Sequence, residues 1–156
     1  MSAQISIIIV ATALISGLGG FVIGRNQVVD PVPLLPHERL AKMHAHEPRE
    51  VETDQPVPTI ELVVHPDNKS GYNLELITTN FNFAPQHAST KYEAGEGHAH
   101  LYINQERIGR LYGHWHHIQS LPKGLNLIRV GLSGNDHTEL THNSEPIAAE
   151  IIVDVE

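Results

Sequence analysis

Histidine is the residue type in this sequence that can both ligate a metal and transfer a proton near neutral pH. The chain has 12 histidines against 10 lysines and arginines together, and it has no cysteine. The lack of thiols excludes disulfides, thiol catalysis, thiolate zinc sites and cysteine-ligated blue copper. Neutral imidazole is the commonest metal ligand, so the histidines indicate metal binding. The candidate ligands lie between residues 98 and 137: His98, His100, His114, His116, His117 and His137.

His98 and His100 are the strongest pair among these candidates, because they lie in the alternating run HAHLYIN. Side chains two residues apart on a strand share one face, and Ala99, Leu101 and Ile103 would share the other. The apolar set must face the core. We therefore expect both imidazoles to point outward together, where they can bind one ion.

The next strand, RIGRLY, predicts how this pair is extended. Setting Leu101 opposite Leu111 keeps apolar residues on one face and gives a short turn around residues 105–106. The same register places His98 opposite His114. The remaining candidates depend on loops, and we rank His137 and His117 next, with His114 and His116 as auxiliary ligands.

The ligand type indicates which metal such a site would bind. Nitrogen-rich sites without thiolate suit Cu(II), Zn(II) or Ni(II), and copper is favoured over zinc at equal geometry. We therefore predict a protein without enzymatic activity that buffers or delivers copper, with zinc as the alternative ion. The other function class is an interaction module whose histidines form a protein-binding or pH-sensing face. A metallohydrolase would need a general base, for which Glu96 and Asp136 are nominal candidates.

The charge balance excludes a further class of partner. Asp and Glu number 18 against 10 for Lys and Arg, which gives a net charge of −8. Proteins that bind nucleic acid depend on clustered Lys and Arg, so we expect no nucleic-acid partner. The chain also lacks a glycine-rich phosphate loop and the spacing of a nucleophile elbow.

The N-terminal segment predicts a membrane anchor. Residues 2–24 carry no charged side chain, and an apolar helix of this length can span a bilayer. Residues 16–20 form a poor cleavage site, so we predict an uncleaved anchor within residues 1–25 rather than a removed signal peptide. Arg25 alone would weakly favour the opposite orientation. Since copper and zinc sites are useful where these metals enter the cell, we predict a single-pass inner-membrane protein with its C-terminal domain in the periplasm.

The rest of the chain divides into a tether and a domain. Residues 26–58 are rich in proline and acidic residues, which predicts a linker. Within it, His37, His44 and His46 could form a soft metal-catching arm, although a solvated polar helix over residues 37–47 is favoured. Residues 59–156 show about six or seven short alternating runs separated by turn signals, which predicts an antiparallel β-sandwich.

The longest motif series supports this fold. The stretches NFNFAPQH, GEGHAHLYIN and RIGRLYGHWHHIQSLPKGLNLIRVGLSGNDH resemble a family of uncharacterised bacterial exported proteins with an immunoglobulin- or cupredoxin-like sandwich. The resemblance covers roughly residues 80–137 and implies that fold together with export. It matches four ligand candidates to the family pattern and leaves His114 and His116 as extra histidines; the four are His98, His100, His117 and His137.

Overall fold

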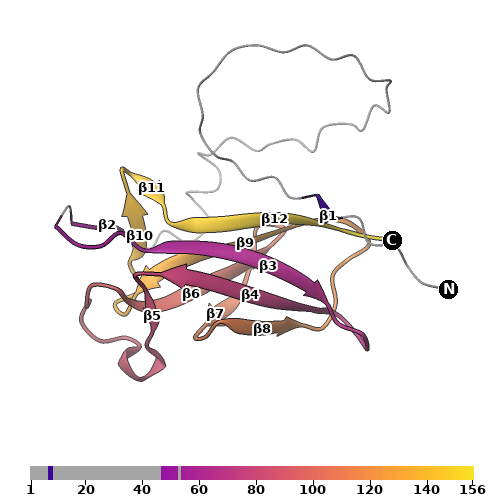
Figure 1. Ribbon diagram of the computed structural model, residues 1–156, viewed down its shortest axis with the longest axis horizontal. Helices are drawn as coiled ribbons and strands as arrows, with labels where there is room; N and C mark the ends of the chain where they lie inside the picture. Colours follow the sequence, from indigo (N-terminus) through magenta and orange to yellow (C-terminus); the bar gives the residue numbers. More distant parts are fainter. Residues whose placement is uncertain (1–6, 9–46, 53) are drawn as a thin grey trace, which may run out of the picture.

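The computed structural model describes residues 7–8, 47–52 and 54–156, which form two β-sheets (Figure 1). The smaller sheet contains β3 (Thr59–Pro66), β4 (Tyr72–Thr79) and β8 (Trp115–Ile118). The nine-stranded larger sheet contains β1 (Ile7–Ile8), β2 (Pro48–Glu50), β5 (Asn82–Phe83), β6 (Glu96–Ile103), β7 (Glu106–Leu111), β9 (Gly124–Gly134), β10 (Glu139–His142), β11 (Glu145–Pro146) and β12 (Ala148–Val155). A short 3-10 helix, η1, covers Pro85–His87. The predicted mainly β fold with two sheets is confirmed.

The smaller sheet follows the alternation expected from the sequence. Its order is β3-β4-β8, and all its pairings are antiparallel. Leu62 pairs with Leu76 and Val64 with Leu74, so that the apolar residues of both strands share one face. That face is buried, as the period-2 pattern requires.

The larger sheet is mixed, so the prediction of an entirely antiparallel sandwich is wrong in this respect. β5 pairs with β6 in parallel, and β2 pairs with β10 in parallel. Parallel neighbours cannot be joined by a tight hairpin, and here residues 84–95 form the longer connection between β5 and β6. Alternation of apolar residues predicts which face of a strand is buried, but it carries no information on strand direction.

The core lies between the two sheets. β3, at one edge of the smaller sheet, contacts β12, and Figure 1 shows the two strands side by side. Buried side chains of both sheets form a single cluster, with Leu74 and Leu76 on one side and Leu101, Ile128 and Leu132 on the other. All five are at most 1 % exposed. β6 and β9 therefore have one face fixed against the core, which leaves their other face for polar residues.

The hairpin between β6 and β7 departs from the expected register. Ala99, not Leu101, lies opposite Leu111, and a bulge follows Leu101. The hairpin turns at Asn104 and Gln105, whose φ angles of 52° and 73° are typical of a type I′ turn. The expected pairing of His98 with His114 is therefore wrong. From Ala99 to Leu101 the shift is two residues, so the side chains there keep their predicted faces. Beyond the bulge the shift is an odd number of residues, and Arg107, opposite Tyr102, lies on the face of the two histidines.

Parts of the predicted anchor and tether lie outside the described residues. Ile7 and Ile8 form β1, which pairs with β12, while the remainder of the predicted anchor and His37, His44 and His46 are not among the residues that the structure describes. Pro48–Glu50, which the sequence assigned to the tether, form β2 of the larger sheet. No helix in the described part of the chain is long and apolar enough to cross a membrane.

Candidate metal centre

Three ring nitrogens converge on the polar face of β6. Nε2 of His98 lies 3.1 Å from Nε2 of His100 and 3.3 Å from Nδ1 of His137. One ligand nitrogen from each of the three residues lies within 4.8 Å of the other two, so this cluster could hold a metal ion. We refer to His98, His100 and His137 as the histidine triad.

β6 positions two members of the triad. It lies between β7 and β9, and it places His98 opposite Ser133 and His100 opposite Gly131 of β9. Both imidazoles point away from the core, as predicted, but the expectation that they are exposed is wrong. His98 is 0 % and His100 3 % exposed. Their face of the sheet is covered by groups from other segments, including the ring of Tyr112, 5.4 Å from that of His98.

A turn after β9 supplies the third member. His137 has a φ of 69°, and the turn is closed by hydrogen bonds from its backbone N–H to the Gly134 carbonyl and from the Gly134 N–H to the Thr138 carbonyl. A non-glycine residue with positive φ is uncommon and needs support from its surroundings. The turn therefore has to be held in place for His137 to face the other two histidines.

Arg49 of β2 holds this turn. Its Nη2 donates to Asp136 Oδ2 at 2.8 Å, and its Nε donates to Thr138 Oγ1 at 3.1 Å. Burial by itself would raise the pKa of the Asp136 carboxyl, but hydrogen bonds from Thr138 and Arg49 outweigh burial and leave that pKa below its usual value. The guanidinium also stacks on Tyr92, 4.4 Å from the ring centroid. β2 thus orients His137, although the turn residues that Arg49 contacts follow it by 87 and 89 residues in the chain.

The outer ring nitrogens of two triad members contact serine hydroxyls. Ser89 Oγ lies 2.9 Å from Nε2 of His137, and Ser133 Oγ lies at a longer 3.5 Å from Nδ1 of His100. Such contacts fix ring orientation and tautomer in metal sites. Arg107 Nη2 donates to Nε2 of His100 at 2.9 Å. Because a guanidinium only donates, this nitrogen carries a lone pair, which is the form that a metal ligand requires.

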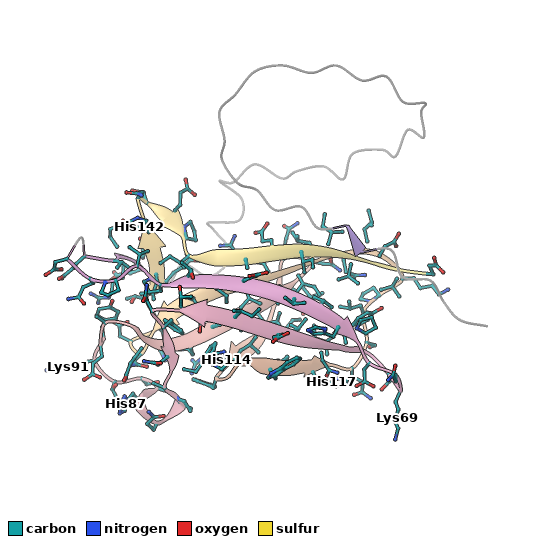
Figure 2. All side chains as sticks on the ribbon, viewed as in Figure 1. Lys69, His87, Lys91, His114, His117 and His142 are labelled. Atoms are coloured by element: carbon teal, nitrogen blue, oxygen red, sulfur yellow. The ribbon has the colours of Figure 1, made fainter. Side chains whose placement is uncertain are left out.

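The other predicted ligands lie on or next to β8, in the smaller sheet (Figure 2). His117 Nδ1 is 3.0 Å from Asn73 Oδ1, and His114 Nδ1 is 2.9 Å from the Leu76 carbonyl. Burial, and secondarily the charge of His117, lowers the pKa of His116. The structure brings His137 to the strand pair and does not bring His114, His116 or His117 there.

Several residues around the triad were missed in the sequence. Arg107 was missed because the bulge in the hairpin brings it near His100, and Ser89 because it lies in the irregular connection between β5 and β6. A second group, His87, Glu93 and Glu96, has ligand atoms close enough to hold an ion, and it contains a 2.7 Å contact between His87 Nδ1 and Glu96 Oε2. The sequence signal for this group was the GEGH run that leads into β6.

Searches against family models, curated proteins and solved structures find no match to this chain. The resemblance based on the GHAHLY and NDH motifs accordingly stays a prediction. The case for function rests on the geometry of the triad.

Proposed function

We propose that this protein binds one copper or zinc ion through His98, His100 and His137, and that it buffers or delivers the ion outside the cytoplasm. The observation that carries this proposal is the spacing of the three nitrogens. Zinc–nitrogen bonds of about 2.0–2.1 Å in a tetrahedral site place ligand nitrogens roughly 3.3 Å apart. The two separations that involve His98 Nε2, 3.1 Å to His100 and 3.3 Å to His137, already lie near that value.

The surroundings favour binding over hydrolysis. A hydrolytic metal site needs a general base close to the metal-bound water. Glu96 is engaged by His87 at 2.7 Å, and Asp136 is engaged by Arg49 at 2.8 Å. Both nominal bases therefore have other partners. Copper is the favoured ion because it binds nitrogen donors more tightly than zinc does at equal geometry.

Titration of the full chain with Cu(II) and with Zn(II) tests the proposal. We expect one ion per chain, and we expect the double variant His98→Ala/His100→Ala to lose it. The matched control is His65→Ala/His117→Ala, which removes the same number of imidazoles from the smaller sheet, where they contact Glu75 and Asn73. A wild-type chain that binds neither ion, or a control that loses the ion equally, would refute the assignment.

The membrane anchor, the periplasmic location and the relation to immunoglobulin- or cupredoxin-like domains are part of the same proposal. The uncharged run of residues 2–24 supports the anchor. Ile7 and Ile8 cannot pair with β12 and lie inside a bilayer at the same time, so an anchor that includes them requires β1 to separate. Protease treatment of intact spheroplasts should digest the domain. A domain protected until lysis would contradict the orientation.

One observation favours the alternative of an interaction module. Trp115 is 60 % exposed on β8, an edge strand of the smaller sheet, and its ring lies 5.4 Å from that of His65. Exposed aromatic residues are enriched at protein interfaces. If the chain binds neither metal, this face becomes the leading candidate for function, and Trp115→Ala is the variant to compare in partner capture.

A further inference from the structure

The contact between Arg107 and His100 places a permanent cation against the candidate metal site. Arg107 Nη2 donates to Nε2 of His100 at 2.9 Å, and this is the ring nitrogen that faces His98. Arg107 is half-buried in β7. Within residues 47–52 and 54–156, the ion pairs involve Arg49 and Arg129 but not Arg107. Among these residues, no carboxylate forms an ion pair with the guanidinium that contacts the triad.

Glu139, an acidic residue near Arg107, does not form an ion pair with it. The charges of Arg107 and Glu139 both act on the Tyr102 hydroxyl, and burial is the main cause that raises its pKa. Glu139, however, contacts Arg129 at 3.5 Å rather than Arg107. Arg129 is also bound to Glu150 at 2.9 Å. Within the described residues, the Arg107 guanidinium thus contributes a positive charge beside the triad that no acidic side chain pairs with.

Metal binding would sharpen this imbalance. An ion that takes the lone pair of His100 Nε2 ends its hydrogen bond with Arg107 and leaves two cations beside each other near buried groups, where their repulsion is poorly screened. The three ligands found among the described residues also leave one coordination position of a four-coordinate ion open. The repulsion between the two cations and the open coordination position both favour binding of an anion between the metal and Arg107.

We propose that the triad takes its metal together with a small oxyanion, of the carboxylate, carbonate or phosphate type. One oxygen would fill the open coordination position, and another would accept hydrogen bonds from the Arg107 guanidinium. Guanidinium matches such anions in shape and charge, since its donors form a planar fork. The inference rests on the proposed metal site and adds a second ligand to it.

The thermodynamic consequence is that metal and anion support each other. If the anion strengthens metal binding, the metal strengthens anion binding by the same factor. Couplings between sites typically amount to about 5- to 150-fold in affinity. The affinity of the chain for its metal should therefore depend on the anions in the buffer, and it should do so through Arg107.

A Zn(II) competition titration of the full chain tests this dependence. The titration is carried out in a buffer without oxyanions and then with acetate, bicarbonate or phosphate, each in a separate arm, which distinguishes the three sources of the anion. We expect at least one arm to tighten Zn(II) binding by about tenfold. Arg107→Gln should abolish the increase, and Arg107→Lys should keep part of it. Arg110→Gln is the matched control, because Arg110 is exposed on the same strand and contacts the Tyr112 hydroxyl.

The outcomes separate this inference from the proposed function. A wild-type chain that binds Zn(II) equally tightly in all arms would overturn the inference and leave the metal site standing. An anion effect that persists unchanged in Arg107→Gln would also overturn it, because the anion would then not use Arg107. The variant is measured in the same solutions as the wild type, so direct binding of Zn(II) by the anions cancels. A wild-type chain that binds no Zn(II) in any arm would remove the proposed metal site itself.

Discussion

Replacing Arg49 tests whether a strand far from the triad in sequence controls its geometry. Arg49→Ala removes two hydrogen bonds to the turn that carries His137 and the stacking on Tyr92. Hydrogen bonds contribute about 0.5–1.5 kcal/mol each and an exposed cation–π contact about 0.5–1 kcal/mol. The side chains of Arg49 and Asp136 are 39 % and 25 % exposed, so solvent screens their ion pair and the lower values apply. We expect a loss of about 1.5 kcal/mol.

This loss should appear in metal binding because the positive φ of His137 needs the support of the turn. If the whole amount acts on the turn, Zn(II) affinity falls by at most about 12-fold, since every 1.4 kcal/mol corresponds to a factor of ten. The assay is a competition titration combined with urea unfolding. Arg129→Ala is the control, because it also removes contacts to two acidic residues, Glu139 and Glu150, that do not hold this turn.

Two results would refute the reasoning. Arg49→Ala would unfold more easily yet bind Zn(II) as tightly as the wild type if other contacts hold the turn. Arg129→Ala would lose as much affinity as Arg49→Ala if general destabilisation were the cause. A double-mutant cycle with Asp136→Asn measures the coupling directly, and we expect the two single effects not to be additive.

Two further predictions concern the framework of the site. Gly97→Ala should lower the free energy of unfolding by about 3 kcal/mol, because a Cβ there would lie 2.0 Å from the Ser133 carbonyl oxygen. Gly109→Ala is the control, because a Cβ at Gly109 would meet no atom within 4 Å. Equal urea midpoints for the two variants would contradict this prediction. Glu50 accepts hydrogen bonds from Thr141 and from two backbone N–H groups, which lower its pKa below the usual 4.5. Its contribution to stability is present above about pH 4.5 and is lost as the pH falls through the folded-state pKa. Glu50→Gln should therefore destabilise the domain more at neutral than at acidic pH, and a constant difference in urea midpoint would argue against it.

The strand pair of the triad could be predicted from the sequence. Alternation fixed His98 and His100 on one face, opposite Ala99 and Leu101, and that assignment is confirmed. The burial of both imidazoles could not be predicted, because it results from segments that return to this face from elsewhere in the chain. Alternation of apolar and polar residues predicts which face of a strand a side chain lies on, but it does not predict which other segments cover that face.

The register of the β6–β7 hairpin and the existence of β2 could not be predicted from local sequence patterns, for two other reasons. The turn at Asn104 and Gln105 lacks the Asn-Gly or Asp-Gly signature of type I′ turns, and the following bulge has no marker in the sequence. β2 was hidden by the prolines around it, since Pro48 at the start of an edge strand looks like part of a linker. Because of the wrong register, the contact of Arg107 with His100 was not predicted. Because β2 was assigned to the linker, the contact of Arg49 with Asp136 was not predicted either.

The separation of the triad along the chain has a consequence for the lifetime of the protein. His137 follows His98 by 39 residues, and the pairing of β6 with β9 and the turn that Arg49 contacts bring the two histidines together in the folded chain. An ion held by all three histidines therefore binds the native state more tightly than the unfolded chain, where the three ligands are apart. At an ion concentration of about 100 times Kd, this linkage adds at most about 2.7 kcal/mol to stability. Metal supply would thus control how often the chain opens to proteases, so that the amount of intact protein follows the amount of available metal.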